Sequence, residues 1–323
     1  MANRGGSGFS PTVFEMTNPQ PACVRLAAGD AAVEIAPSVG GAIASFALAG
    51  DHVLRPTPAD ARAEGNVRSF ACYPLVPYSN RIANARLAFD GYEHALARNF
   101  GESPHSIHGI GWQRAWSVVS SSASGVQLSL EHGASGGDAA AWPWAFRALQ
   151  TFSLAATARG ATLSARLAIE NTGGQAFPFG LGWHPFFPKP PGTTLAFASG
   201  HVWRNDATQI PERRTAVPDA WRFDPPRPLG EVELDHVFEP ATGTATIRWP
   251  ARGLEVSVEA DRALDRRVVF VPAGRDYFAF EPASHMTDAF NRAARGERDT
   301  GTRILPPGAA FSCTMRLDAR RVG

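Results

Sequence analysis

The sequence predicts an all-β protein, a large antiparallel β-sandwich, on the basis of three observations. Apolar residues recur with period two, short turn sequences separate these segments, and the chain of 323 residues contains 31 glycines and 26 prolines. Such a composition suits a loop-rich β protein better than a helical one. Hydrophobic residues make up 44% of the chain, so a sizeable core can be buried.

The alternation is what predicts individual strands. It is clearest in four segments, at 126–130, 163–169, 254–258 and 311–317. In each of them one face can enter a core while the other meets water, as antiparallel strands require. Turn signals separate the strand-like runs at Asp90-Gly91, 171–174 and 306–308.

Helices are expected at two places only, 57–65 and 285–296, and both are short. Residues 1–20 are rich in Gly, Ser, Asn and Pro, which predicts a flexible N-terminal tail. The proline-rich stretches at 186–192 and 222–228 lie between strand-like runs and are too short to be linkers. We therefore expect residues 21–323 to form a single domain.

Charge and cysteine content exclude several functional classes. Lys and Arg total 31 and Asp and Glu total 30, so the chain has no electrostatic signature for nucleic acid or for a membrane surface. Three cysteines are not a disulfide framework, and none has zinc-finger spacing. With no secretory signal and no apolar run of membrane-spanning length, the expectation is a soluble cytoplasmic protein with a small, nearly neutral partner.

Five local clusters combine polar, reactive groups with aromatic and turn residues, as sugar sites do. In the first, Asn80 and Arg81 offer donors that suit sugar hydroxyls. The alternative interpretation is a loop in which Arg81 pairs with a carboxylate.

The second cluster contains His105, His108 and Trp112. The two histidines could ligate a metal, but nothing nearby completes a ligand set, and a loop histidine is more often structural.

The third cluster places His184 between aromatic residues, where an imidazole can exchange a proton near neutral pH. The alternative is a core histidine with satisfied nitrogens. The fourth and fifth clusters contribute Asp235 and Glu281. Glu281 is expected at the end of a strand that Pro282 stops, where burial would raise its pKa as a general base requires. Alone, either carboxylate could be a surface or capping group.

In order and in kind, these clusters resemble the aldose 1-epimerase (galactose mutarotase) family. The resemblance rests on five elements, 80–82, 108–116, 183–187, 234–236 and 281–291, and runs from about Val33 to about Leu317. It implies the galactose mutarotase-like supersandwich, with the site in a groove on one face. It also implies an isomerase that interconverts the α and β anomers of a free aldose without metal or organic cofactor.

The resemblance further implies roles for individual residues. Glu281 would be the general base that takes the anomeric proton, and His184 the general acid that protonates the ring oxygen. His108 would lie near that oxygen, and Arg81 and Asp235 would bind hydroxyls. From its residue type, Asn80 is expected to be a further donor to the sugar, and Trp112 is a candidate to stack on the apolar face of the sugar. The expected partner is a monosaccharide, with no nucleic acid or membrane, and the expected state of the protein is a monomer or homodimer.

Three alternatives stay open. A hexose-6-phosphate mutarotase on the same fold would need a basic cluster, for which Arg86, Arg114, Arg266 and Arg267 are available. A non-catalytic sugar-binding protein would need no proton-transfer pair. A glycosidase would use Asp235 and Glu281 as its two carboxylates but would leave His184 without a role.

Overall fold

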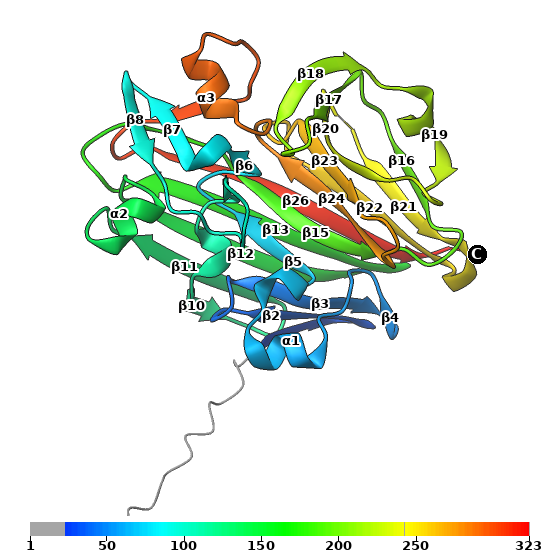
Figure 1. The fold of residues 1–323 in the computed structure, drawn as a ribbon. Coiled ribbons are helices and arrows are strands. Elements are labelled where there is room, and N and C mark those ends of the chain that lie inside the picture. Colours follow the sequence, from blue (N-terminus) through cyan, green and yellow to red (C-terminus); the bar gives the residue numbers. More distant parts are fainter. Residues whose placement is uncertain (1–22, 242, 323) are drawn as a thin grey trace, which may run out of the picture.

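The computed structural model describes residues 23–241 and 243–322. Within them, most strands belong to two large antiparallel sheets packed into a sandwich (Figure 1). This confirms the predicted all-β sandwich. The expected tail at 1–20 lies outside the described residues.

The first sheet has eleven strands in the described part of the chain. Their spatial order is β1 (Val24–Ala28), β2 (Ala31–Ala36), β3 (Ala42–Leu48), β5 (Cys72–Leu75), β15 (Gly182–Pro188), β24 (Tyr277–Ala283), β23 (Arg266–Val271), β20 (Leu234–Glu239), β17 (His201–Asn205) and β18 (Pro211–Ala216), with β4 (Asp51–His52) paired to β3. Its central strands, β5, β15, β24, β23 and β20, bring together the segments that carry the predicted site residues.

The second sheet has nine strands within the same described ranges. Their order is β10 (Ser117–Ser121), β11 (Gly125–His132), β12 (Phe146–Thr157), β13 (Gly160–Asn171), β26 (Ala310–Arg321), β22 (Leu254–Ala260), β21 (Ala245–Trp249), β16 (Thr194–Phe197) and β19 (Phe223–Pro228). All four segments with clear alternation lie here, in β11, β13, β22 and β26.

The remaining elements are short. Three two-stranded ribbons are formed by the described residues: β6 (Arg81–Ile82) with β9 (Ser106–Ile107), β7 (Arg86–Phe89) with β8 (Tyr92–Ala95), and β14 (Phe177–Phe179) with β25 (Arg303–Leu305). The α-helices are α1 (Ala59–Glu64), α2 (Gly137–Ala141) and α3 (Ala289–Ala294). Single 3-10 turns occur at Val67–Ser69, Ala83–Ala85, Gly111–Gln113, Asp219–Trp221 and Pro250–Arg252. Helices α1 and α3 confirm the two expected short helices, whereas α2 was not anticipated.

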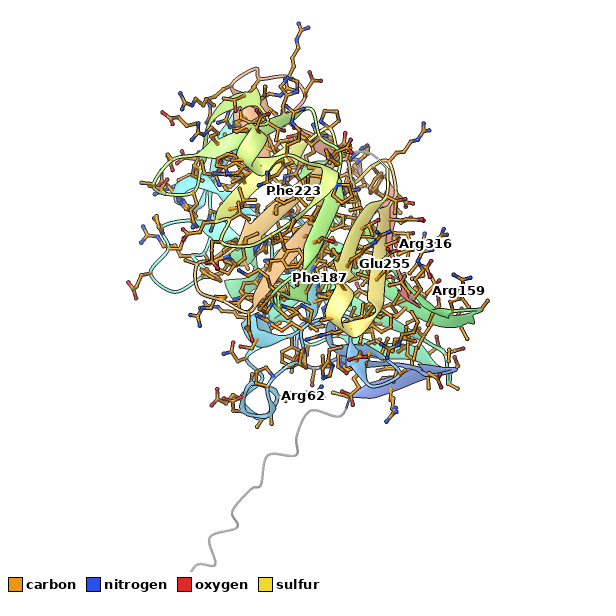
Figure 2. All side chains as sticks on the ribbon, turned by 90° about the vertical axis from the view of Figure 1, so that its right-hand side faces the viewer. Arg62, Arg159, Phe187, Phe223, Glu255 and Arg316 are labelled. Carbon is orange, nitrogen blue, oxygen red and sulfur yellow. The ribbon has the colours of Figure 1, made fainter. Side chains whose placement is uncertain are left out.

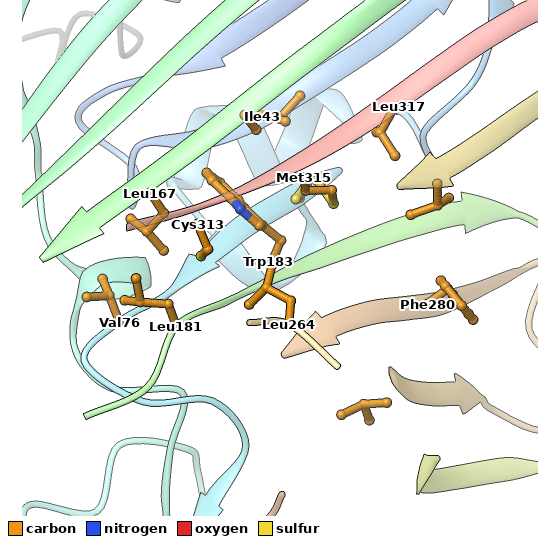
Figure 3. Packing of buried hydrophobic residues seen from close by; sticks show 14 of the residues in the cluster. Ile43, Val76, Leu167, Leu181, Trp183, Leu264, Phe280, Cys313, Met315 and Leu317 are labelled. Atoms are coloured by element: carbon orange, nitrogen blue, oxygen red, sulfur yellow. The ribbon is translucent and has the colours of Figure 1, made fainter. Parts of the chain in front are cut away.

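The hydrophobic core lies between the two large sheets. Trp183 of β15 is fully buried, and Figure 3 shows it among Cys313 and Met315 of β26 and Leu167 of β13. Burial of such side chains stabilises the fold by about 1.5–3 kcal/mol each. On the other side of β26 the side chains face water, as Arg316 does at the edge of the molecule in Figure 2. The second sheet is therefore buried on one face only.

The central strands of the first sheet are buried on both faces. Every residue of β15 is buried, and in β24 only Tyr277 is partly exposed. One face belongs to the core, and on the other a second buried cluster brings Ile107 and Trp112 together with Tyr73, Phe186 and Ala279 of the central strands. No helix in the described ranges is long and apolar enough to cross a membrane.

Candidate active site

The floor of the candidate site is a row of side chains across three adjacent strands. Tyr73 of β5 pairs with His184 of β15. The register that pairs Gly182 with Ala283, and Phe186 with Ala279, sets His184 opposite Glu281 of β24. Directly opposed residues on neighbouring strands have Cβ atoms about 4.5–5.5 Å apart. The sheet therefore brings together an imidazole and a carboxyl group that are far apart in the sequence.

The expectation that Pro282 stops the strand is wrong. Strand β24 continues through Ala283, and Pro282 pairs with Arg267 of β23. A proline lacks only the N–H donor, so it can remain in a ladder where that donor has no partner. Strands β15 and β24 pair at Gly182 and again at Phe186, but no pairing joins them between these two residues. Glu281 lies opposite this unpaired part of β15, inside β24 rather than at its end.

His184 and Glu281 form a close, buried pair. His184 Nε2 lies 3.3 Å from Glu281 Oε1, and the two side chains are 8% and 3% exposed. Burial raises the pKa of Glu281 well above its usual value, and the nearby Asp235 carboxylate adds to this. Burial, with Arg55 and Arg81 nearby, lowers the pKa of His184 to about 3. Both shifts disfavour the charged form of the group concerned.

Arg81 and Asp235 lie at one side of this pair. Arg81 Nη2 is 3.7 Å from Asp235 Oδ2, and both side chains are largely buried. Burial raises the pKa of Asp235, while Arg81 opposes this shift. The carboxylate partner expected in the alternative interpretation of Arg81 therefore exists, and it is itself one of the predicted site residues.

The loop after β5 presents Asn80 and Arg81 to the site. The Asn80 N–H donates to Nδ1 of His108 at 3.0 Å. Because this nitrogen accepts, the proton of the neutral His108 ring is on Nε2. Burial, with His184 and Arg81 nearby, lowers the pKa of His108 well below its usual value. His108 can therefore act toward a ligand only as a hydrogen-bond donor. Its ring centroid lies 5.2 Å from that of His184.

These groups line one pocket with a volume of about 220 Å³. This is below the roughly 300–1,000 Å³ of pockets for drug-sized ligands, so it suits a smaller guest. Its lining consists of Arg68, Tyr73, Asn80, Arg81, Phe100, Ile107, His108, His184, Phe186, Asp235, Phe270, Tyr277 and Glu281. Six of the seven predicted site residues are in that set.

The model of the family named Aldose 1-epimerase matches residues 22–318. The chain belongs to the aldose 1-epimerase family. The protein YphB of Escherichia coli K12, itself uncharacterized, is 30% identical over 291 residues, which are 86% of this chain and 92% of YphB.

Solved structures agree on the fold of this family member. A crystal structure from Escherichia coli K12, described as a candidate aldose 1-epimerase, superposes with a TM-score of 0.82 at 28% identity and covers 93% of this chain and 99% of its own. A galactose mutarotase-like protein from Clostridium acetobutylicum superposes with a TM-score of 0.80 at 17% identity, covering 93% and 95%. The second likeness shows the fold alone.

Trp112 is the one predicted site residue that does not line the pocket. It is 1% exposed and stacks on Tyr73 with ring centroids 5.5 Å apart. Its Nε1–H donates to the Gly109 carbonyl at 3.1 Å. Trp112 thus lies behind the lining and supports Tyr73 and the segment after His108. In the sequence it could not be distinguished from an exposed stacking residue, because both are aromatics in a glycine-rich loop.

Two arginines beside the pocket were not anticipated. The Arg55 guanidinium lies over the rings of Phe186 and Tyr277, 4.0 and 4.3 Å from their centroids. Arg68 lies 4.0 Å over the ring of Phe100 at the pocket wall. No local pattern in the sequence marks either one, since the aromatic partners are distant along the chain.

The four arginines proposed for a phosphate group all have other partners. Arg86 pairs with Glu93, and Arg114 pairs with Asp138. Arg266 binds Glu239, and Arg267 is buried and donates to backbone carbonyls. None of the four lines the pocket described above.

Proposed function

We propose that this protein is a mutarotase that interconverts the α and β anomers of a free aldose. The observation that carries the proposal is the buried pair of His184 and Glu281, 3.3 Å apart in a pocket that also contains Arg81 and Asp235. Membership of the aldose 1-epimerase family supports it. A proton-transfer pair beside groups that bind hydroxyls is what anomer exchange requires.

The proposed reaction needs only one shared proton. Ring opening begins with the proton on His184 and with Glu281 as a carboxylate. Glu281 takes the proton of the anomeric hydroxyl as the C1–O5 bond breaks, and His184 gives its proton to O5. The pair is then neutral, with a protonated Glu281 and a neutral imidazole.

Burial favours this same neutral form, because it raises the pKa of Glu281 and lowers that of His184. The protonation state that accompanies the open-chain aldehyde is thus the one that the site stabilises. Rotation about C1–C2 presents the other carbonyl face. Closure then returns the proton from Glu281 to O1 and moves the O5 proton to His184.

Four residues are proposed to hold the sugar during these steps. Arg81 and Asp235, 3.7 Å apart, would bind adjacent hydroxyls, and Asn80 would add a further polar contact. His108, which can offer only its Nε2–H, would donate to the ring oxygen or to a neighbouring hydroxyl. Trp112, behind Tyr73, would act through that ring.

The test is anomer exchange of freshly dissolved sugars, followed by polarimetry or NMR. α-Glucose, α-galactose, pentoses and deoxy sugars would be compared with buffer alone. We expect acceleration with at least one aldose and a loss of kcat of about 10²–10⁴-fold for Glu281→Gln, since general acid–base groups contribute that much. Glu259→Gln, an exposed change on β22, is the matched control. No acceleration with any aldose, or a Glu281→Gln variant as active as the parent, would overturn the proposal.

A further inference from the structure

Three histidine side chains accept hydrogen bonds from the backbone of the loop that carries Asn80 and Arg81. We call residues 79–84 the anchored loop. Three of its N–H groups donate to imidazoles: Ser79 to His285 Nε2 at 3.0 Å, Asn80 to His108 Nδ1 at 3.0 Å, and Asn84 to His105 Nδ1 at 2.9 Å. His108 belongs to the pocket, whereas His105 and His285 lie outside its lining.

Each of the two outer histidines uses its second nitrogen as a donor. His285 Nδ1 donates to the Met286 carbonyl at 2.7 Å, and His105 Nε2 donates to the Thr208 carbonyl at 3.1 Å. A neutral imidazole has one donor and one acceptor, so both rings are fully used in this form. Burial lowers the pKa of His285 to about 4 and also lowers that of His105, which keeps both rings neutral.

The anchored loop needs such support because its own conformation is costly. Asn80 and Asn84 have φ values of +57° and +53°, and the next residue, Ala85, has +52°. A residue with a side chain in this left-handed region costs about 1–2 kcal/mol, somewhat less for asparagine. The loop contributes only the two-residue strand β6 to regular pairing. Its geometry therefore depends on side-chain acceptors.

His105 also connects the anchored loop to a second loop. The Thr208 carbonyl that it binds belongs to the turn between β17 and β18, and the next residue, Gln209, accepts a hydrogen bond from Arg81 Nη2. Asp206 closes this turn by accepting from the Thr208 and Ile210 N–H groups at 2.7 and 3.1 Å. The second loop thus binds the Arg81 side chain through Gln209, and it is connected through His105 to the backbone of the anchored loop at Asn84.

We propose that His105 and His285 are positioning residues, which hold the anchored loop so that Arg81 points into the pocket beside Asp235. The proposal rests on the proposed sugar site. Neither histidine touches the sugar. Both act through Arg81 and Asn80, so their loss weakens substrate binding before it affects the proton transfers at His184.

The first experiment separates binding from chemistry in the full chain. For His105→Leu and His285→Leu we expect a KM about tenfold higher, with kcat nearly unchanged. Each change leaves a loop N–H without its acceptor, which disfavours the conformation that binds the sugar by a free energy of about this factor. His105→Asn should restore KM, because its Oδ1 can take the place of Nδ1 toward Asn84. His285→Gln should do the same toward Ser79. An unchanged KM in the folded leucine variants, or a loss in kcat alone, would overturn the proposal.

The matched control is His132→Leu. His132 is as buried as the other two, at 5% exposed, and its Nε2 binds the Trp142 carbonyl at 2.8 Å, but it lies in β11 of the second sheet. This change should lower the Tm and leave KM unchanged. A similar rise in KM for His132→Leu would show that the effect is general destabilisation, and would also overturn the proposal.

The second experiment asks whether His105 acts through Arg81. In an Arg81→Ala background, His105→Leu should raise KM no further, because residues that act as one unit are not additive. Additive effects on KM would overturn the proposal. Amide hydrogen exchange of residues 79–84 gives a readout that needs no turnover. Faster exchange at Asn84 in His105→Leu, but not in His105→Asn, is expected, and equal exchange in all variants would contradict the anchoring whether or not the parent is a mutarotase.

Discussion

At the scale of single residues, one proton shared by two buried groups dominates the proposed chemistry. The imidazole and carboxyl of His184 and Glu281 would each be common in isolation, and neither reveals its partner in the sequence. Their closeness of 3.3 Å makes the pKa of each depend on the other. The pH dependence of activity is thus the most direct probe of the pair.

We predict a broad pH profile of kcat/KM. The active form carries one proton, so activity falls in acid when a second proton binds His184, whose pKa is lowered to about 3. It falls in alkali when the last proton leaves Glu281, whose pKa is raised above the usual 4.5. Rates corrected for buffer catalysis between pH 4 and 9 test this. An acid-side loss of activity centred near 6.5, the ordinary pKa of histidine, would contradict it.

We also predict that Glu281→Gln stabilises the protein relative to the parent as pH rises. A carboxyl whose pKa is raised in the folded state binds more protons there than in the unfolded chain. The parent therefore loses stability as pH increases from about 4.5 through the folded-state pKa, and the glutamine variant does not. Tm values of both proteins at pH 5 and pH 8 measure the difference. The expectation would be refuted if the Tm of Glu281→Gln minus the Tm of the parent stayed constant or decreased from pH 5 to pH 8.

At the scale of elements, consecutive residues of one strand face opposite sides of the sheet, so that one contributes to the core and the next to the candidate site. Trp183 and His184 are consecutive in β15, yet one faces the core and the other the pocket. Strands of the second sheet were predictable from sequence because their outer face is polar. Strands β15 and β24 show no such alternation, because both of their faces are buried. The interpretation of Pro282 as a strand end failed for a different reason, since a proline remains in a ladder where its missing donor has no partner.

The segment after His108 provides a test at this scale. Gly109 has φ of +68°, and a Cβ there would lie 2.3 Å from the Val76 carbonyl oxygen. Gly109→Ala should destabilise the protein by more than about 1–2 kcal/mol, the cost of the left-handed conformation alone, and should raise KM by displacing His108. Gly308→Ala is the control, since it has φ of +70° with open space around it. Urea unfolding and KM values would be compared. Equal losses of stability would contradict the predicted clash.

At the scale of the whole molecule, both large sheets are assembled from distant parts of the chain. Strand β26, near the C-terminal end, lies between β13 and β22, and β15 lies between β5 and β24. Such pairings follow from long-range register, which no local pattern encodes. The alternation predicted the sandwich, and the family resemblance predicted that His184 and Glu281 act on one sugar. The register that sets them in one row, with Tyr73 beside His184, could not be predicted.

This interleaving predicts one cooperative unfolding transition. No group of strands can separate without exposing the core shared by the two sheets. Calorimetry and tryptophan fluorescence should therefore report the same transition temperature. Two separable transitions would show that the chain consists of independent units, against the expectation of a single domain.

The sheet and the loops contribute different residues to the candidate site, and this has a consequence for engineering. His184 and Glu281 are set by the register of two central strands, whereas Asn80, Arg81 and His108 come from loops above them. We therefore expect grafted loops to alter which sugar the proposed site accepts, while His184 and Glu281 retain their spacing. Selection for a new specificity should therefore vary the loops around the pocket and leave strands β15 and β24 unchanged.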